Sequence, residues 1–498
     1  MSQFGLLKSC LNPGTRYILH IYMIGIFLLF VACASRSPPD HSGLSVSTPV
    51  ATLDTTNPIA LCESVDLNWG KDWTVTIRSL EALQGMNADC SDGLAVGNRL
   101  YLAYMSYGTL QEERGRIDEA VQAYETARAF DFTGAEAVAR LRLLGALTPE
   151  PPPACESSIV EAALSQIPEF TPTTSDFVAT EGGKFWLSGQ LFTVYGINYY
   201  PRDYPYGRFL TEMDVESILF ELDLMRTSGI NTIRLYIRHD DLFICPGNGA
   251  IPIPENLARL DALILAAAER EFKIILVLNY EPDLSVYPLY DAPPHTLQQI
   301  QFIAQRYKDE SAIIAYDLND HGDLDFMSEH AQFTQEQVLE WLGQTSTLVR
   351  EFAPNQLLTV GWDNNSVLTA PLVDFVSFQN FGDVETLRQE IALLKAETSK
   401  PILLGSMGYS SLYYDEIGHR QAFQRAFEAA ERNGLVGWVV WTAFDFPLNV
   451  TCIEPDCPGE IAPINTYGLW NTSYFPKRAL DAVEQATGVK SFSGNDSG

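Results

Sequence analysis

Positive charge is scarce in this chain. Lys and Arg together number 32 of 498 residues, against 63 Asp and Glu, and the formal net charge is −31 at pH 7. A protein that binds nucleic acid needs cationic surface to replace the counterions of phosphate, so the sequence argues against a nucleic-acid partner. Charged residues of both signs amount to 19% and apolar residues to 46%. That composition is typical of a globular protein, and the length predicts two or three folded units.

Long apolar runs are rare too, and one stands near the N-terminus, from Tyr17 to Cys33. Its roughly fifteen apolar residues are short for a membrane-spanning helix, which needs ~20, but they suit the core of a signal peptide. The closing letters "FVAC" resemble the cleavage site of bacterial lipoproteins, with Phe30 where Leu is usual. The resemblance implies a signal peptide over 1–32, lipidation of Cys33 and an extracytoplasmic, membrane-anchored protein. An uncleaved N-terminal anchor is the alternative, and it implies the same location.

Cysteine is sparse, at eight residues, and no Cys/His spacing resembles a zinc site. We therefore expect neither a metal nor a cofactor. If Cys10 is lost with the signal and Cys33 carries lipid, an even number of cysteines remains in a compartment where disulfides persist. Cys452 and Cys457 are near enough in sequence to close one loop. The pairing of the others stays open, namely Cys62, Cys90, Cys155 and Cys245.

Two distinct segments precede the main domain. Residues 33–61 are rich in Ser, Thr and Pro and predict a tether. Residues 62–147 carry Ala, Leu and aromatic residues at helical spacing. Within them "YMSYGTLQEERGRIDEAVQAYETARAFDF" resembles a tetratricopeptide repeat, in which small residues such as Gly108 and aromatics such as Tyr124 let two helices pack closely. We expect a helical spacer domain or, alternatively, a docking module for a protein partner, followed by a Pro-rich linker over 148–177.

From 178 to 488 short apolar runs alternate with amphipathic stretches. Eight runs, rich in β-branched and aromatic residues, are typical of buried parallel strands. They are "LFTVYGINYY", "INTIRLYI", "FKIILVLNY", "AIIAYDL", "LLTVGW", "VDFVSFQN", "KPILLGS" and "GWVVWTAF". With helices predicted over 211–228, 254–271, 334–352, 384–398 and 415–433, they indicate an α/β fold of the (β/α)8 (TIM) barrel type. Residues 489–498 are expected to form a disordered tail.

The order of features in the barrel segment resembles glycoside hydrolase family 5 and related retaining (β/α)8 glycosidases. "GKFWLSGQLFTVYGINYYPRDYP" is similar to the family's opening, and "TYGLWNTSYFPKRALDAV" is similar to its closing segment. Arg234 matches the family's strand 2 arginine, and Trp441 matches the strand 8 tryptophan beneath the sugar subsite. The resemblance implies an oligosaccharide or polysaccharide ligand, bound by Asn198, Arg234, Gln379 and Trp441.

Both catalytic glutamates of that family are missing. Retaining hydrolysis needs two carboxyl groups about 5 Å apart, one as acid/base and one as nucleophile. When the strand 4 motif is laid without gaps on "YDLNDHG", His321 stands in the acid/base position, although a shift of one residue would place Asp320 there. In "PILLGSMGYS" Ser406 takes the nucleophile's position, and its hydroxyl has no negative charge. The strand 6 His and Tyr that orient the nucleophile are replaced by Gln379 and Phe381.

Three hypotheses for function follow. The first is a carbohydrate-binding pseudo-glycosidase that keeps the groove without the catalytic carboxylates. The second is an active glycosidase with relocated acids, for which Asp320 and Asp323 are the possible substitutes. The third is an assembly scaffold that acts through the helical domain. Sugar binding is favoured because pyranose faces stack on aromatic rings, and eight aromatic residues stand at or just beyond strand ends. They are Tyr199, Tyr200, Tyr236, Tyr280, Trp362, Phe381, Trp441 and Phe444.

Overall fold

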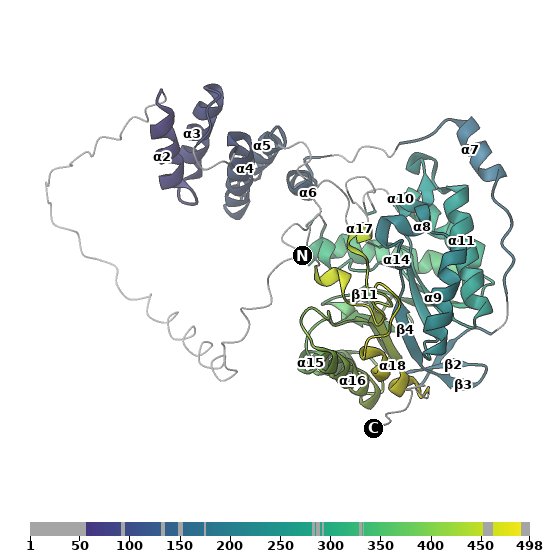
Figure 1. Cartoon of the computed structure of the whole chain (residues 1–498). Helices are drawn as coiled ribbons and strands as arrows, with labels where there is room; N and C mark the ends of the chain where they lie inside the picture. Colours follow the sequence, from purple (N-terminus) through teal and green to yellow (C-terminus); the bar gives the residue numbers. More distant parts are fainter. Residues whose placement is uncertain are drawn as a thin grey trace, which may run out of the picture. The chain divides into compact units, whose positions relative to one another are not determined.

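The described chain consists of an N-terminal helical segment and a barrel, shown in Figure 1. The computed structural model describes residues 56–90, 95–130, 135–147, 153–173, 176–280, 284, 289–290, 293–327, 331, 333–451 and 462–489. Within these ranges no helix is both long enough and apolar enough to cross a membrane. The predicted signal peptide with Cys33, and the predicted Cys452–Cys457 pair, lie outside the described residues and stay predictions.

The helical segment begins earlier than the sequence suggested. Its helices are α2 (Pro58–Asn68), α3 (Trp73–Gly85), α4 (Val96–Glu113), α5 (Ile117–Arg128) and α6 (Ala135–Leu143). The start of α2 falls inside the range predicted as a tether, because Asn57 caps it by accepting from the Ile59 N–H and proline suits the first helical position. A disulfide joins Cys62 in α2 to Cys90 beyond α3.

The pair α4 and α5 packs around one glycine. A Cβ atom on Gly108 would lie 2.5 Å from Cε1 of Tyr124, closer than side chains ever approach. Tyr124 is fully buried, and its hydroxyl donates to Glu112. The predicted use of a small and an aromatic residue between two helices is confirmed. The assignment of the segment as a tetratricopeptide repeat stays a prediction.

The predicted Pro-rich linker is more ordered than a plain spacer. It contains α7 (Ser157–Ser165), and a disulfide joins Cys155 to Cys245 of the barrel. Asn248 Oδ1 accepts from the Cys155 N–H at 2.6 Å, and the Gly247 N–H donates to the Pro153 carbonyl at 2.8 Å. The sequence left both observed disulfide pairings open, because the spacing of cysteines does not reveal which are neighbours in space.

The eight predicted strands all form, and they make the parallel barrel that the sequence predicts. They are β4 (Val194–Asn198), β5 (Thr232–Tyr236), β8 (Lys273–Val277), β9 (Ile313–Asp317), β10 (Leu357–Thr359) with β11 (Gly361–Trp362), β12 (Val376–Gln379), β13 (Ile402–Met407) and β14 (Gly437–Trp441). The hydrogen-bonded order is β10-β9-β8-β5-β4-β14-β13-β12-β11. Only Val360 separates β10 from β11, so the two ends of the sheet are neighbours in the chain and the sheet curves round on itself. A three-stranded antiparallel sheet of β1 (Ala179–Glu181), β2 (Lys184–Leu187) and β3 (Gln190–Phe192) precedes it.

Helices cover the outer face of the strands, as Figure 1 shows. They are α9 (Val215–Thr227), α11 (Pro254–Glu269), α12 (Pro293–Tyr307), α14 (Gln335–Phe352), α15 (Val384–Glu397), α16 (Glu416–Arg432) and α18 (Ala479–Thr487), while the short α8 (Phe209–Glu212) lies in the connection between β4 and α9. Local sequence determines where three of these helices begin. The Asp214, Asp383 and Asp415 side chains accept hydrogen bonds from backbone N–H groups in the first turns of α9, α15 and α16. The five predicted helical stretches are confirmed, whereas α12 and α18 were not predicted.

Candidate functional site

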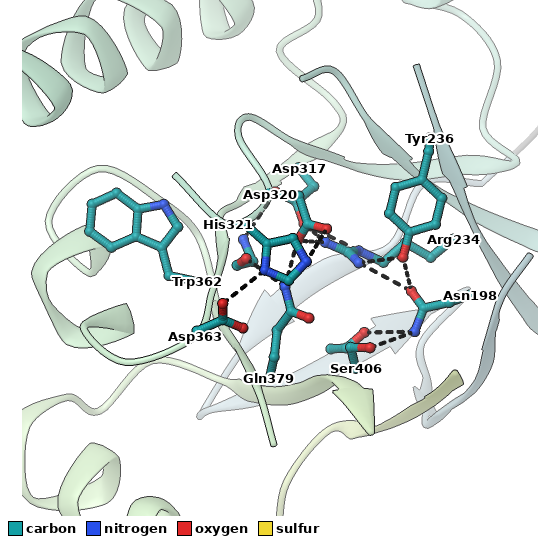
Figure 2. A network of polar contacts seen from close by, with 12 residues as sticks. Asn198, Arg234, Tyr236, Asp317, Asp320, His321, Trp362, Asp363, Gln379 and Ser406 are labelled. Atoms are coloured by element: carbon teal, nitrogen blue, oxygen red, sulfur yellow. Dashed lines mark hydrogen bonds and ion pairs between the residues drawn. The ribbon is translucent and has the colours of Figure 1, made fainter. Parts of the chain in front are cut away.

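A buried polar network, drawn in Figure 2, joins Arg234 of β5 to the C-terminal end of β9 and the turn after it. Arg234 of β5 donates from Nε to Asp317 Oδ2 at 3.2 Å, and from Nη2 to both Asp317 and Asp320. All three side chains are at most 1% exposed. Charges can be buried this deeply only when they are paired and hydrogen-bonded, so one guanidinium here compensates two carboxylates.

Strands β11 and β12 close this network. The Gly361 N–H donates to Asp317 Oδ1 at 3.0 Å. A Cβ atom at Gly361 would lie 2.4 Å from Arg234 Nη2 and 2.6 Å from Asp320 Oδ1. Gln379 Nε2 donates to Asp320 Oδ1 at 2.8 Å and to the Gly361 carbonyl at 2.9 Å. The absence of a side chain at 361 is therefore what lets the charged groups meet.

Burial sets the acid–base properties of the network. It raises the pKa of Asp320 to about 6, against the opposing effects of Arg234 and His321. Burial also disfavours the charge on Arg234, but its carboxylate neighbours, Asp320 foremost, hold the pKa of the guanidinium well above its ordinary value. A carboxyl that titrates near neutrality has the pKa of a general acid, but the Asp320 side chain is 1% exposed. In this structure the Asp320 carboxylate is instead the acceptor for Arg234 Nη2 and Gln379 Nε2.

Asn198 joins the network to the end of β13. Its Oδ1 accepts from Arg234 Nη1 at 3.1 Å and from the Tyr236 hydroxyl at 2.5 Å. Its Nδ2 donates to the Gly405 carbonyl at 3.3 Å and to Ser406 Oγ at 3.2 Å. Ser406 is 1% exposed. The partner of its hydroxyl is an amide donor and not a base, so this contact does not activate Ser406 as a nucleophile.

His321 lies on the solvent side of Asp320. Its Nδ1 is 2.8 Å from Asp363 Oδ2, and its Nε2 is 3.6 Å from Asp320 Oδ2. The His321 and Asp363 side chains are 21% and 25% exposed. The backbone of His321 has a φ of 57°, and its N–H donates to the Gly361 carbonyl at 3.0 Å. Asp363 therefore orients the imidazole through Nδ1, while Nε2 faces the Asp320 carboxylate.

Asp323, the second predicted substitute acid, accepts hydrogen bonds from backbone N–H groups. Its Oδ1 accepts from the Asp363 N–H at 3.2 Å, and its Oδ2 accepts from the Asn364 N–H at 2.8 Å. It is fully buried. Because both oxygens hold the turn after β11, the structure gives Asp323 a supporting role for the loop that carries Asp363.

Most of the aromatic residues predicted at the rim are packed inside the fold. Tyr199, Trp362 and Phe444 are 0% exposed, so the expectation that they line a groove is wrong. They belong to the hydrophobic cluster shared with the surrounding helices, and Figure 2 shows the Trp362 indole turned away from the polar network. Phe381 differs, because it is 44% exposed.

Trp441 is covered by other rings. Its ring centroid lies 6.2 Å from that of Tyr200, 6.5 Å from that of Tyr206 and 6.1 Å from that of Tyr236. As a result only 8% of Trp441 is exposed. Sequence reasoning named three of these four rings and missed Tyr206, because it lies in the loop after β4 and not at a strand end.

The four predicted sugar-binding residues converge in space. Asn198, Arg234 and Gln379 share the polar network, and Tyr236 connects that network to Trp441. Asn198 and Arg234 are 0% and 1% exposed, so in this structure they position other groups and do not face solvent. Gln379 and Trp441 retain 5% and 8% exposure.

The chemical capacity of the site follows from these positions. The two acids at the centre of the network come from β9 and its following turn and share one cation, while the end of β13 presents a neutral hydroxyl. Retaining hydrolysis uses an acid and a nucleophile on either side of the glycosidic bond, and the side chain at the end of β13 is a hydroxyl. Among the described residues no three His, Cys, Asp or Glu side chains are grouped so as to hold a metal ion.

Comparison with known proteins bears on the fold. No family model and no curated protein matches this chain. The solved structure of exo-β-1,4-mannosidase Op5Man5 from Opitutaceae bacterium strain TAV5 is 20% identical, with a TM-score of 0.54 over 62% of this chain and 61% of its own. GH5_18 from Streptomyces cattleya in complex with GlcNAc is 15% identical, with a TM-score of 0.52 over 59% of this chain and 80% of its own. The barrel has a GH5-like fold.

A third structure agrees. A GH5_18 from Bifidobacterium longum subsp. infantis is 14% identical, with a TM-score of 0.51 over 59% of this chain and 78% of its own. At such identities the likeness concerns the fold alone. The predicted resemblance is therefore confirmed for the barrel, and the function must be argued from the site.

Proposed function

We propose that the barrel binds carbohydrate and does not hydrolyse it by the retaining mechanism. The observation that carries this proposal is the distribution of charge around the network. Arg234 compensates both Asp317 and Asp320 on one side, while Ser406 on β13 is held by the Asn198 amide. A retaining glycosidase needs one carboxyl group on each side of the scissile bond, about 5 Å apart.

Carbohydrate is the ligand that the remaining features support. The barrel has a fold similar to that of Op5Man5, a mannosidase, and to that of a GH5_18 structure that contains GlcNAc. Stacking on an aromatic face and hydrogen bonding to hydroxyls do not require the missing carboxylates. Trp441 and Gln379, both at strand ends, retain 8% and 5% exposure and supply a ring and an amide at the same end of the barrel.

Turnover and binding together test the proposal. We expect no hydrolysis of aryl β-mannosides, aryl β-glucosides or β-linked polysaccharides above the blank. A rate near 1 s⁻¹, at the low end for enzymes, would contradict the proposal. Calorimetric titration with β-1,4-linked manno- and gluco-oligosaccharides should show binding at or below millimolar concentration. If wild type binds none of them, the carbohydrate proposal fails and the scaffold hypothesis is favoured.

Substitution of Trp441 tests where the sugar binds. We expect Trp441→Ala to weaken oligosaccharide binding about ten-fold or more, because the ring contact is lost, and Trp441→Phe to retain most of it. Trp186→Ala is the matched control, because Trp186 lies on β2, outside the barrel sheet. A thermal melt of each variant separates loss of binding from loss of fold.

A second candidate function rests on His321. Its imidazole is oriented by Asp363 at 2.8 Å and remains 21% exposed, which is the geometry of an oriented acid/base. If turnover is found, its loss in His321→Ala would assign catalysis to this pair. Its loss in Asp320→Ala with retention in His321→Ala would instead assign the acid to Asp320.

A further inference from the structure

Three lysines line one pocket at the N-terminal end of the barrel strands. The pocket has a volume of about 340 Å³, and Lys184, Lys395 and Lys400 are among the residues that form its walls. Lys184 begins β2, Lys395 lies in the last turn of α15, and Lys400 stands two residues before β13. We call this space the lysine pocket. It lies where the barrel strands begin, whereas the candidate site lies where they end.

Positive charge is concentrated in the lysine pocket. The chain has only nine lysines, and its acids outnumber Lys and Arg together by 63 to 32. Among the described residues that line the pocket, none is Asp or Glu. Within the described part of the chain, none of the three ammonium groups forms an ion pair. Like charges that gather without a counter-charge repel one another, so an anion bound between them is favoured.

Two of the lysines are held on the same turn of backbone. Lys184 Nζ donates to the Gly434 carbonyl at 2.6 Å, and Lys395 Nζ donates to the Asn433 carbonyl at 2.8 Å. Asn433 and Gly434 are consecutive residues just beyond α16, so the two ammonium groups lie near each other. An ammonium group carries three N–H donors, and a bond to one carbonyl leaves two of them for a ligand.

Lys400 is held by two carbonyls and is partly buried. Its Nζ donates to the Ala370 carbonyl at 2.5 Å and to the Val373 carbonyl. Burial lowers the pKa of this ammonium group, against the opposing effect of Asp374. The Asp374 carboxylate is itself paired with Arg350 at 2.9 Å. An anion in the pocket would therefore stabilise a charge that burial makes costly.

Neutral donors complete the lining of the pocket. Thr398 Oγ1 accepts from the Lys400 N–H at 3.1 Å, which leaves the hydroxyl hydrogen of Thr398 to donate. Gly182 and Gly183 form the turn between β1 and β2, with φ of 59° and 73°. A Cβ atom at Gly183 would lie 3.5 Å from the Ser399 carbonyl oxygen, so the turn packs close to this loop. Hydroxyl groups and the backbone N–H groups of tight turns are donors that bind anions.

We propose that the lysine pocket binds the phosphate group of a small, soluble phosphate ester. A phosphate monoester carries a charge of about −1.5 to −2 at pH 7 and three acceptor oxygens, which match a cluster of ammonium donors better than a carboxylate does. Lysine binds phosphate as a compact point charge with three donors. The volume of the pocket lies within the range of small-molecule sites, about 300–1,000 Å³.

The charge of the whole chain favours a soluble ester over a phospholipid headgroup, which carries the same chemical group. An anionic membrane surface attracts extended clusters of Lys and Arg, and this chain has a net charge of −31. A small dianion can enter the pocket without bringing a charged surface against the protein. The proposal is independent of carbohydrate binding, because the two sites lie at opposite ends of the barrel strands.

Calorimetric titration of the full chain tests the proposal, with inorganic phosphate and glycerol phosphate as probes at low ionic strength. We expect both to bind at or below millimolar concentration, and added sodium chloride to weaken them. Lys184→Gln with Lys395→Gln should weaken binding about ten-fold or more, while Lys184→Arg with Lys395→Arg should keep most of it. Lys400 is left unchanged, because its two carbonyl contacts also support the fold.

Lys71→Gln is the matched control. Lys71 Nζ donates to the Leu67 carbonyl in α2 at 3.1 Å, so it makes the same kind of bond away from the pocket, and its loss should leave phosphate binding unchanged. A thermal melt of each variant separates loss of binding from loss of fold. Oligosaccharide binding should be the same in the double glutamine variant and in wild type.

Three results would overturn the proposal. In the first, wild type binds neither phosphate probe, which would show that the lysines only stabilise the C-terminal end of α16. In the second, the double glutamine variant binds phosphate as tightly as wild type. In the third, the protein binds phosphatidylglycerol vesicles through these lysines but does not bind glycerol phosphate.

Discussion

At the scale of single residues, Gly361 is the position on which the buried charges depend. A methyl group there would lie 2.4 Å from Arg234 Nη2, 2.6 Å from Asp320 Oδ1 and 2.8 Å from Asp317 Oδ2. We expect Gly361→Ala to lower the free energy of unfolding by about 2–4 kcal/mol. The methyl group would push the Arg234 guanidinium away from the two carboxylates, which are too deeply buried for water to compensate their charge. Urea unfolding followed by tryptophan fluorescence measures the change.

The control for this prediction is Gly343→Ala in α14. A Cβ atom at Gly343 meets its nearest neighbour, Leu372, only at 3.9 Å. This variant should be neutral or slightly more stable, by up to about 1 kcal/mol, since alanine is the better helix former. Equal losses in both variants would show that the charge cluster is not the cause.

Residue identities at strand ends were readable from the sequence, and their contacts were not. The pattern placed Arg234 within a predicted strand and Ser406 and Trp441 at the ends of two others, where the structure has them. It could not reveal that Arg234 compensates two acids, because that depends on the turn after β9. Nor could it reveal that Tyr206 covers Trp441, because the loop after β4 has no periodicity from which its position could be inferred.

At the scale of elements, the contact between α4 and α5 shows how one glycine sets the distance between two helices. A side chain at Gly108 would overlap the Tyr124 ring at 2.5 Å. We expect Gly108→Ala to destabilise the pair by about 1–3 kcal/mol, with the overlap outweighing the gain in helix propensity. Hydrogen exchange of the full chain should then show faster exchange of the α4 and α5 amides, with the barrel amides unchanged.

Gly97→Ala in the same helix is the matched control. A Cβ atom there meets nothing within 4 Å, so exchange in α4 should stay the same or become slower. If Gly108→Ala also left exchange unchanged, the close approach of the two helices would not be a determinant of stability.

The helices and strands were easier to predict from the sequence than the contacts between them. Each strand of the barrel is a short, almost wholly apolar run, because both of its faces are covered, and that signal is strong. The helix α12 was not predicted, although its sequence is amphipathic at helical spacing. The ordered segment around α7 was not predicted. The Cys155–Cys245 disulfide ties this segment to the barrel, and such a pairing cannot be inferred from the spacing of cysteines.

At the scale of the whole molecule, the acidic composition was evident from the sequence, but the acids that matter to stability were not. Glu221 of α9 is 2% exposed and accepts from the Tyr199 and Tyr474 hydroxyls, each at 2.7 Å. Burial raises its pKa to about 7, against the effect of those donors and of the Arg202 N–H. The carboxyl group therefore ties the residue after β4, helix α9 and the C-terminal segment together by accepting hydrogen bonds, while burial favours its protonated form.

Several such acids should make the folded protein less stable in alkaline solution. Burial raises the pKa of Glu221, Glu390 and Asp241 to about 7, well above their ordinary values. By linkage their stabilisation is complete below the unfolded pKa, near 4, and is lost as pH rises through the folded pKa. Burial lowers the pKa of His239 to about 4 and also lowers that of His419, so these two oppose the trend only as pH falls below about 6.5.

Between pH 6.5 and 8.5 the pH dependence of stability therefore reports on Glu221, Glu390 and Asp241 and not on the two histidines. We expect the free energy of unfolding to fall by about 2 kcal/mol across this range, because the folded state must give up protons that the unfolded chain has already lost. Glu221→Gln, which keeps a neutral group between the two tyrosines, should reduce this slope. Glu212→Gln, which removes a surface carboxylate paired with Arg208, should leave the slope unchanged. Stability that rose with pH across this window in wild type would show that these carboxyl groups are ionised in the folded state.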